Sequence, residues 1–276
     1  MPRRKIPSIA IALCLILAGC GAGTTGDANT VDPSLEGTPS VSPTATETAA
    51  PTPPGVGEET VLGELQTAHA EAFRAANRSF TYRSVSRAAN GTAMRTTTLR
   101  VAVEGTEWLG ESTVGGAVPL RPPVVDRHRR YANESVVVST TRTAGGEYDG
   151  RVQRRRGTAT GAPDGATYVY RLLSGVDLRV TDRTETDHGT ILTVRGSADT
   201  APGVAGATRR NVSVVAEIRA DGLVVSAEAT FDDRVAGVPV ETTQSFRLTE
   251  RTGTTVERPV WVPTVIRRNG TQTTPA

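Results

Sequence analysis

Cysteine, lysine and aromatic residues are scarce in this chain of 276 residues. The two cysteines, Cys14 and Cys20, both lie close to the N-terminus, and lysine occurs once, as Lys5. Aromatic residues make up 4% of the sequence. A disulfide framework is therefore excluded for everything that follows Cys20, and the core has to be built mainly from small aliphatic side chains.

Positive charge is concentrated at the start of the chain. The sequence has 31 basic and 29 acidic residues, but Arg3, Arg4 and Lys5 precede Cys20 and no acidic residue does. Without these three, 28 basic residues remain, one fewer than the 29 acidic residues. The net charge of the rest therefore gives no reason to expect nucleic acid as a partner.

Residues 1–19 have the three parts of an export signal peptide. The basic start MPRRK precedes the apolar run IPSIAIALCLILAG. That run is shorter than the roughly 20 residues that a membrane-spanning helix needs. We therefore predict that the segment is cleaved and that the mature protein begins at Cys20. The Arg3–Arg4 pair leaves twin-arginine export open as the route.

The tetrapeptide LAGC resembles the lipobox of bacterial and archaeal lipoproteins. Leu17 would take position −3, the small residues Ala18 and Gly19 would flank the cleaved bond, and Cys20 would receive a lipid by thioether linkage. A disulfide with Cys14 and a catalytic thiol are the alternatives. However, Cys14 would leave with the signal peptide. The resemblance implies an exported protein that Cys20 anchors to the outer face of the cytoplasmic membrane.

Composition divides the remaining chain into three parts. Residues 20–57 are rich in Thr, Pro, Gly, Ser and Ala, so they cannot bury enough apolar surface to offset the entropy of ordering, and we predict a disordered tether that begins at the lipidated cysteine. Its Ser/Thr–Pro character resembles O-glycosylated stalks. Residues 58–265 are predicted to form one β-rich domain, and residues 266–276 a flexible tail.

A helix opens the predicted domain. The apolar residues on its stripe recur at three- and four-residue steps: Val61, Leu62, Leu65, Ala68, Ala72 and Phe73. Three turn pairs, Asn90-Gly91, His188-Gly189 and Asp221-Gly222, separate β-branched runs and predict hairpins. A short second helix is expected within 166–176.

Alternation is clearest around the third hairpin. It assigns one face to each strand, Val212, Val214, Ala216 and Ile218 before the turn, and Leu223, Val225, Ala227, Ala229 and Phe231 after it. The predicted fold class is therefore α+β and mainly antiparallel β. We expect a curved, meandering sheet, or half-barrel, with an N-terminal helix and a second short helix.

This layout resembles the half-barrel fold of bacterial lipoprotein carriers and mycobacterial surface lipoproteins. The segment TTVERPVWVP (254–263) resembles their final strand. The whole chain, with its lipobox, Thr/Pro tether and NRSFTYR motif (77–83), is also similar to a group of uncharacterised archaeal surface lipoproteins. The resemblance implies a sheet that curls around a cavity for a lipid or other apolar ligand.

Five tripeptides match the acceptor sequence for N-linked glycans. Their asparagines are Asn77, Asn90, Asn133, Asn211 and Asn269. Chance matches are the alternative, because threonine is abundant. A glycan is least expected at Asn211, which lies at the start of a predicted strand.

Two arginine-rich segments remain, DRHRRY (126–131) and RVQRRR (151–156). They predict either a patch for acidic glycans or lipid headgroups, or solvated strand faces offset by nearby acids, and we favour the second interpretation.

Nothing in the sequence predicts catalysis or a cofactor. The histidines, His69, His128 and His188, lack the spacing of metal ligands, and we interpret the acids around His188 as a charged hairpin tip. The sequence around Ser112 does not match the Gly-x-Ser-x-Gly elbow. We therefore predict a membrane-anchored lipoprotein that is not an enzyme and binds an apolar ligand. The alternative is a structural or interaction domain of the cell envelope on a glycosylated stalk.

Overall fold

The computed structural model describes residues 52–57, 61–119, 124–154, 161–187, 189–203, 208–249 and 254–270. Their helices and strands follow in this order: α1 (Leu62–Arg74), β1 (Arg78–Arg87), β2 (Ala93–Glu104), β3 (Glu107–Gly115), β4 (Val125–Ala132), β5 (Val136–Thr143), β6 (Tyr148–Arg154), α2 (Ala166–Leu173), β7 (Arg179–Thr186), β8 (Gly189–Pro202), β9 (Thr208–Arg219), β10 (Val224–Val235), β11 (Val238–Thr249) and α3 (Trp261–Gly270).

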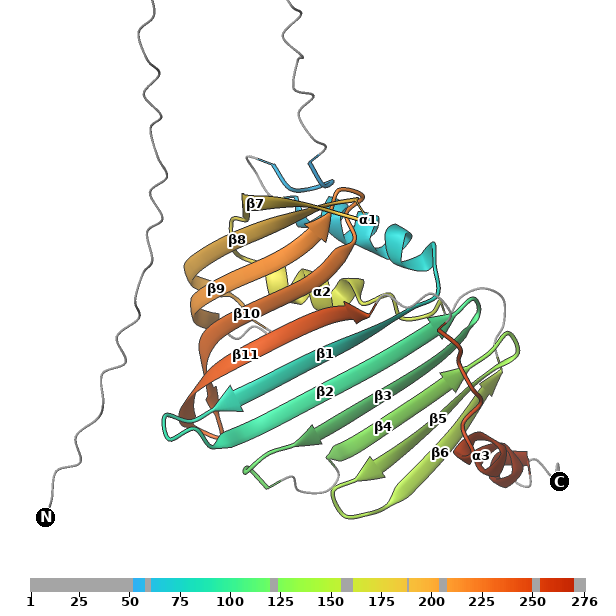
Figure 1. Ribbon diagram of the computed structural model, residues 1–276. Coiled ribbons are helices and arrows are strands. Elements are labelled where there is room, and N and C mark those ends of the chain that lie inside the picture. The colour runs from blue at the N-terminus through green and yellow to red at the C-terminus, as the bar shows by residue number, and fades with distance from the viewer. Residues whose placement is uncertain are drawn as a thin grey trace, which may run out of the picture. The chain divides into compact units, whose positions relative to one another are not determined.

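The strands form one antiparallel sheet of eleven strands. Their order is β6-β5-β4-β3-β2-β1-β11-β10-β9-β8-β7, so the first and last strands pair at the centre. The consecutive strands β6 and β7 lie at opposite edges, and α2 belongs to the connection between them. Figure 1 shows the sheet curving around α1 and α2. The predicted half-barrel and its α+β class are confirmed.

The predicted hairpins form where the turn pairs lie. Asn90-Gly91 connects β1 to β2, and Asp221-Gly222 connects β9 to β10. Gly91 and Gly222 both have positive φ, the backbone conformation that these tight turns require. Strands β7 and β8 also pair in register up to Thr186 and Gly189, while His188 lies outside the described residues.

A β-bulge corrects one detail of the predicted faces. Leu223, Ala227, Ala229 and Phe231 are buried as expected, but Val225 is only partly buried and Val224 is fully buried instead. The register between β10 and β9 shifts between Val224 and Ser226. The extra residue in the bulge reverses which residues of the strand point toward the core on its two sides. The sequence pattern alone does not reveal this change.

The main core lies between the sheet and the first two helices. Leu65 and Phe73 of α1 are buried in it, as predicted for the stripe of the first helix, and Leu172 and Leu173 of α2 are buried there as well. Val61, which the predicted stripe included, is 48% exposed because it precedes the first turn of α1. His69 and Ala70 are buried instead.

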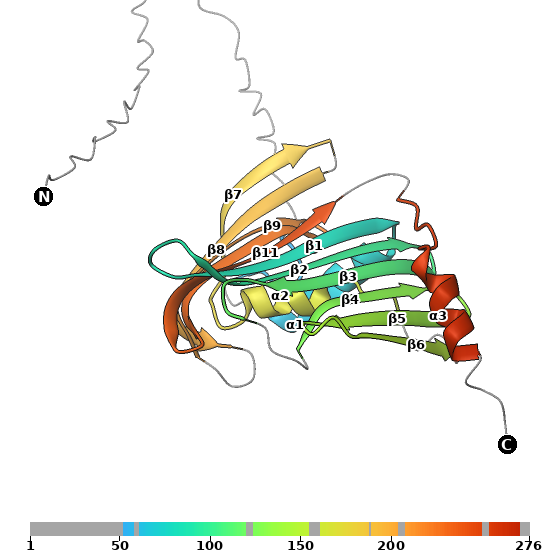
Figure 2. The ribbon, with the colours of Figure 1, turned by 90° about the horizontal axis from the view of Figure 1, so that it is seen from below.

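A second core lies on the other face of the sheet. Val137 and Val138 are neighbours on β5, so their side chains point to opposite faces, and only Val138 belongs to this second core. Val262 and Val265 of α3 belong to it as well. Helix α3 contacts β5 and β6, and Figure 2 shows it beside these strands.

The predicted final strand is wrong. Residues 254–260 have no strand structure, and α3 begins at Trp261. The place beside β11 is already taken, because β10 and β1 pair with its two sides. The segment instead runs to the outer face, where the Val256 N–H donates to Glu104 Oε2 at 2.6 Å and Val256 is buried. Helix α3 continues to Gly270, beyond the boundary expected at residue 265.

Candidate functional site

The predicted anchor lies outside the described residues. This applies to Leu17, Ala18, Gly19 and Cys20, and to the tether as far as residue 51. Within the described ranges, none of the helices combines the length and the apolar character that crossing a membrane requires. The tether's last described residues, 52–57, belong to the domain, since Val56 is buried in the main core.

The concave side of the sheet is filled by side chains where an apolar ligand was expected. All four phenylalanines of the chain, Phe73, Phe80, Phe231 and Phe246, are buried there. The ring centroids of Phe80 lie 5.9 Å from Phe73 and 5.3 Å from Phe246, which are contact distances for packed aromatic rings. The described helices and strands therefore pack directly against one another at this place.

Two close contacts fit α2 into this concave side. Gly165 precedes α2 with φ of +80°, and a Cβ atom there would lie 2.6 Å from Cε2 of Phe246. Only glycine allows both this backbone conformation and this approach. In the first turn of α2, the ring of Tyr168 lies 4.6 Å from that of Tyr82 on β1. Burial is the main cause that raises the pKa of Tyr82.

His69 joins three segments inside the main core. The ring has no exposed surface, its Nδ1 accepts the Val224 N–H at 3.1 Å, and its Nε2 lies 3.0 Å from the carbonyl of Asp164. The neutral tautomer with hydrogen on Nε2 satisfies both contacts. Burial lowers the pKa of His69 from 6.5 to about 4. The imidazole thus holds backbone atoms of β10 and of the loop before α2.

Arg209 on β9 holds the end of α2 in the same way. Its guanidinium donates to the carbonyls of Pro202 at 2.9 Å, Arg171 at 3.0 Å and Ser174 at 2.6 Å. It also lies over the ring of Phe231, 5.3 Å from the centroid. The residue is 6% exposed, and burial lowers its pKa. Carbonyls at a helix C-terminus attract a cation, so this buried charge has a structural role.

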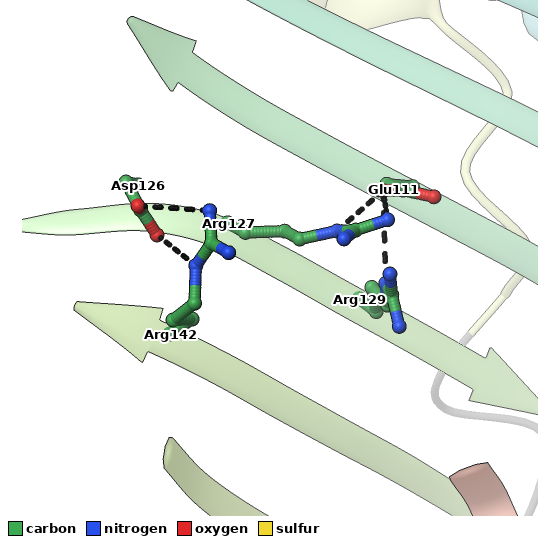
Figure 3. Close-up of polar contacts among 5 residues, drawn as sticks. All are labelled: Glu111, Asp126, Arg127, Arg129 and Arg142. Atoms are coloured by element: carbon green, nitrogen blue, oxygen red, sulfur yellow. Dashed lines mark hydrogen bonds and ion pairs between the residues drawn. The ribbon is translucent and has the colours of Figure 1, made fainter. Parts of the chain in front are cut away.

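The first arginine-rich segment forms β4, where ion pairs offset its charge. Arg127 and Arg129 both reach Glu111 on β3, while Asp126 accepts two hydrogen bonds of 3.0 Å from Arg142 on β5 (Figure 3). These contacts support the interpretation as a strand face offset by acids. The two arginines do not share the Glu111 carboxylate equally. Arg127 donates to it at 2.6 Å, whereas Arg129 Nε lies 3.6 Å from its Oε1. That buried Nε has no hydrogen-bond partner.

Arg129 borders a groove of about 610 Å³ on the outer face of the sheet, between α3 and strands β4–β6, which we call the α3 groove. Its lining combines charged, aromatic and hydroxyl or amide side chains: Arg129, Thr140, Tyr148, Asp149, Arg151, Trp261, Thr264, Arg268 and Asn269. Arg151, from the second arginine-rich segment, donates to Asp149 at 2.9 Å. Arg155 and Arg156 of that segment lie outside the described residues.

The five glycosylation candidates differ in what their side chains do. Asn77 and Asn90 are exposed, and each accepts a backbone N–H with Oδ1, from Gly105 and Thr92. Asn133 is partly buried, accepts two backbone N–H groups and hydrogen-bonds Tyr131.

The amide nitrogens of the other two are engaged. Asn211 Nδ2 donates to Asp232 at 2.6 Å, and Asn269 Nδ2 donates to the carbonyls of Gly150 and Val265. Asn211 lies within β9 with φ of 51°, and Asn269 ties α3 to β6. The structure therefore separates sequons that look alike in the sequence.

The remaining polar clusters show no convergence on a metal. In the described part of the chain, no group of three or more His, Cys, Asp or Glu residues is placed to hold one. Arg130 Nε lies 3.3 Å from His128 Nε2, and burial lowers the pKa of His128. Near the second turn pair, His188-Gly189, Glu185 accepts the Thr190 hydroxyl at 2.8 Å.

Sequence patterns could not identify the α3 groove. Its residues come from the edge strand β6, from its neighbours β5 and β4, and from a C-terminal helix that the sequence did not predict. Only the clustering of arginine in 126–131 and 151–156 pointed toward this face.

No protein-family model matches the chain, and no curated protein matches it. Among solved structures, it is similar to LprF from Mycobacterium bovis, with 11% identity over 72% of this chain and 99% of that one, at a TM-score of 0.33. It is similar to lipoprotein LppX of Mycobacterium tuberculosis, with 10% identity over 69% and 98%, at a TM-score of 0.31. A third is an outer membrane lipoprotein-sorting protein domain from Vibrio parahaemolyticus, with 11% identity over 75% and 97%, at a TM-score of 0.23.

Proposed function

We propose that this protein is an exported lipoprotein, anchored through Cys20, whose β-rich domain acts as a non-catalytic interaction domain of the cell envelope. The observation that supports an interaction domain is the packing of side chains on the concave side of the sheet. Phe73, Phe80 and Phe246 are each 1% exposed there, so the helices and the sheet already cover the surface that an apolar ligand would need. Anchoring rests on the signal peptide and lipobox in the sequence.

The use of the buried polar groups supports a non-catalytic domain. His69 and Arg209 are buried and have lowered pKa values, features that often mark active sites. Here both make hydrogen bonds to backbone groups of α2 and its flanking loops. The burial and the lowered pKa values of His69 and Arg209 are therefore explained by their structural role in holding α2.

Replacing Cys20 with serine tests the anchor. Serine cannot form the thioether, so we expect the C20S protein to leave the membrane fraction, where the wild-type protein should be found. The measurement is fractionation of the producing cells followed by intact mass, which should show the added lipid on wild-type protein alone. Replacing Cys14 is the matched control, because that residue would be removed with the signal peptide. A C20S protein that stays in the membrane fraction contradicts the anchor.

We expect N-linked glycans only on asparagines whose side-chain amide nitrogen makes no hydrogen bond within the fold, because that nitrogen receives the sugar. We expect glycopeptide mass spectrometry to find occupancy at Asn77 and Asn90. Asn211 and Asn269 should be unmodified, since their Nδ2 atoms donate hydrogen bonds within the fold. Occupancy at either of the latter in folded protein would contradict this assignment.

An apolar ligand on the concave side is the second candidate function. The observation that favours it is the concentration of the chain's few aromatic residues beneath α2, among them Phe80, Tyr82 and Phe246. A ligand would have to displace α2, with its contacts to Arg209, in order to reach them. Native mass spectrometry of the C20S protein, which lacks the covalent lipid, separates the two candidates.

A further inference from the structure

We propose that the α3 groove binds an acidic saccharide, a sugar ring that carries a carboxylate. This deepens the proposed function, on which it rests, by naming the chemistry of the envelope component that the domain would contact.

The charges of the groove favour an anion. Arg129, Arg151 and Arg268 line it together with a single acid, Asp149, which Arg151 contacts. Glu111, the acid nearest to Arg129, is already engaged by Arg127. Arg129 lines the groove, and its ion pair with Glu111 is a long contact of 3.6 Å, so a carboxylate in the groove would give its guanidinium a closer acceptor. Arginine presents its N–H groups in a planar fork that matches the two oxygens of a carboxylate.

The uncharged lining favours a sugar as the carrier of that anion. Tyr148 is 66% exposed, although a tyrosine ring is largely apolar, and Trp261 is the other aromatic residue of the groove. Aromatic faces pack against the C–H face of a sugar ring. The hydroxyls of Thr140 and Thr264 can exchange hydrogen bonds with the hydroxyls on its rim. A flat anionic surface needs neither a concave site nor these groups.

A larger hollow of the described surface does not share this character. It measures about 940 Å³ and lies at the turns that connect β1 to β2 and β10 to β11. Three arginines line it, but three acids, Asp232, Asp233 and Glu241, line it as well. Its own charges offset one another, so an anion gains little there.

The groove and the first described residues lie at opposite ends of the described domain (Figure 1). Residues 52–57, where the tether joins the domain, pack at the start of α1, because the Val61 N–H donates to the Gly55 carbonyl at 2.9 Å. Figure 1 shows α1 and α3 at opposite ends of the described domain.

Calorimetric titration of the full-length protein in detergent tests the proposal. The probes are an oligomer of galacturonic acid and the neutral galactose oligomer of the same length. We expect the acidic oligomer to bind at least about tenfold more tightly than the neutral one, the effect of one charge-assisted hydrogen bond. Vesicles of anionic phospholipid, in a parallel titration, distinguish a membrane surface from a sugar as the source of the anion.

Two variants locate the site. We expect R129Q to weaken binding of the acidic oligomer at least about tenfold. Y148S changes a largely exposed side chain, so it should fold normally and also weaken binding. R247Q removes the same charge from an exposed position on β11 and should bind within about twofold of wild type.

The proposal is overturned if the acidic oligomer does not bind or binds no more tightly than the neutral one. It is equally overturned if Y148S and folded R129Q bind as wild type does, or if the vesicles bind and the saccharide does not. The titration does not depend on Cys20, so its failure would leave the anchor intact. A failure of the C20S experiment would likewise leave this site untouched.

Discussion

Replacing Arg209 with methionine is expected to lower the free energy of unfolding by about 3 kcal/mol or more. Methionine keeps an unbranched apolar stem but donates nothing to the carbonyls of Arg171, Ser174 and Pro202. Those three carbonyls would lose this donor, and the C-terminus of α2 would lose its cation. Denaturant unfolding followed by circular dichroism measures the change.

Arg210 provides the matched control on the same strand. It is exposed, so R210M should change the unfolding free energy by no more than about 0.5 kcal/mol. R209K should recover little of the loss, because an ammonium cannot reach three carbonyls as a planar guanidinium does. An R209M protein as stable as R210M would show that this hydrogen-bond cluster does not hold α2.

The second large effect is a loss of stability in acid that depends on His69. Its pKa is 6.5 when the chain is unfolded and about 4 when folded, mainly because of burial. Above pH 6.5 both states hold the neutral ring, so this residue contributes no pH dependence. As the pH falls from 6.5 to 4, the unfolded chain takes up the proton first and the folded state becomes less favourable. The full effect is about 3 kcal/mol at pH 4 and below.

Comparison with H69Q isolates this contribution from that of the carboxylates. Two charged groups act on His69 besides burial: Asp164 raises its pKa and Arg78 lowers it. Both remain in the variant. We expect wild type to be the more stable protein at pH 7 and its advantage to shrink by about 3 kcal/mol by pH 4. H128Q, which changes a less buried ring, is the control and should follow wild type more closely. A constant difference between wild type and H69Q would contradict the account.

Local rules predicted most of the sheet. Asn90-Gly91 and Asp221-Gly222 favour tight turns, and alternation from Val212 to Ile218 assigns a buried face without knowledge of the partner strands. The pairing of β1 with β11 is different. It joins residues that lie far apart in the chain, and no local pattern encodes it.

The residues that hold the helices were missed for a related reason. His69 and Arg209 look like ordinary polar residues, and each acquires its role from carbonyl or N–H groups of distant segments. The segment before α3 was misread because Val256, Trp261 and Val262 suit a strand as well as a helix. Which of these forms depends on the sheet having no place left beside β11. The α3 groove depends on that outcome, so sequence could not predict it.

Native mass spectrometry of the exported protein tests most directly whether the concave side is a packed core or a ligand site. The comparison uses wild type and C20S, because C20S lacks the covalent lipid and any remaining apolar molecule must be bound by the fold. With Phe73, Phe80 and Phe246 buried against one another, we predict that C20S has the mass of its polypeptide and any glycans alone. A lipid that accompanies C20S in fixed proportion, and is lost on unfolding, would contradict the packed interior and establish the domain as a carrier of apolar ligands.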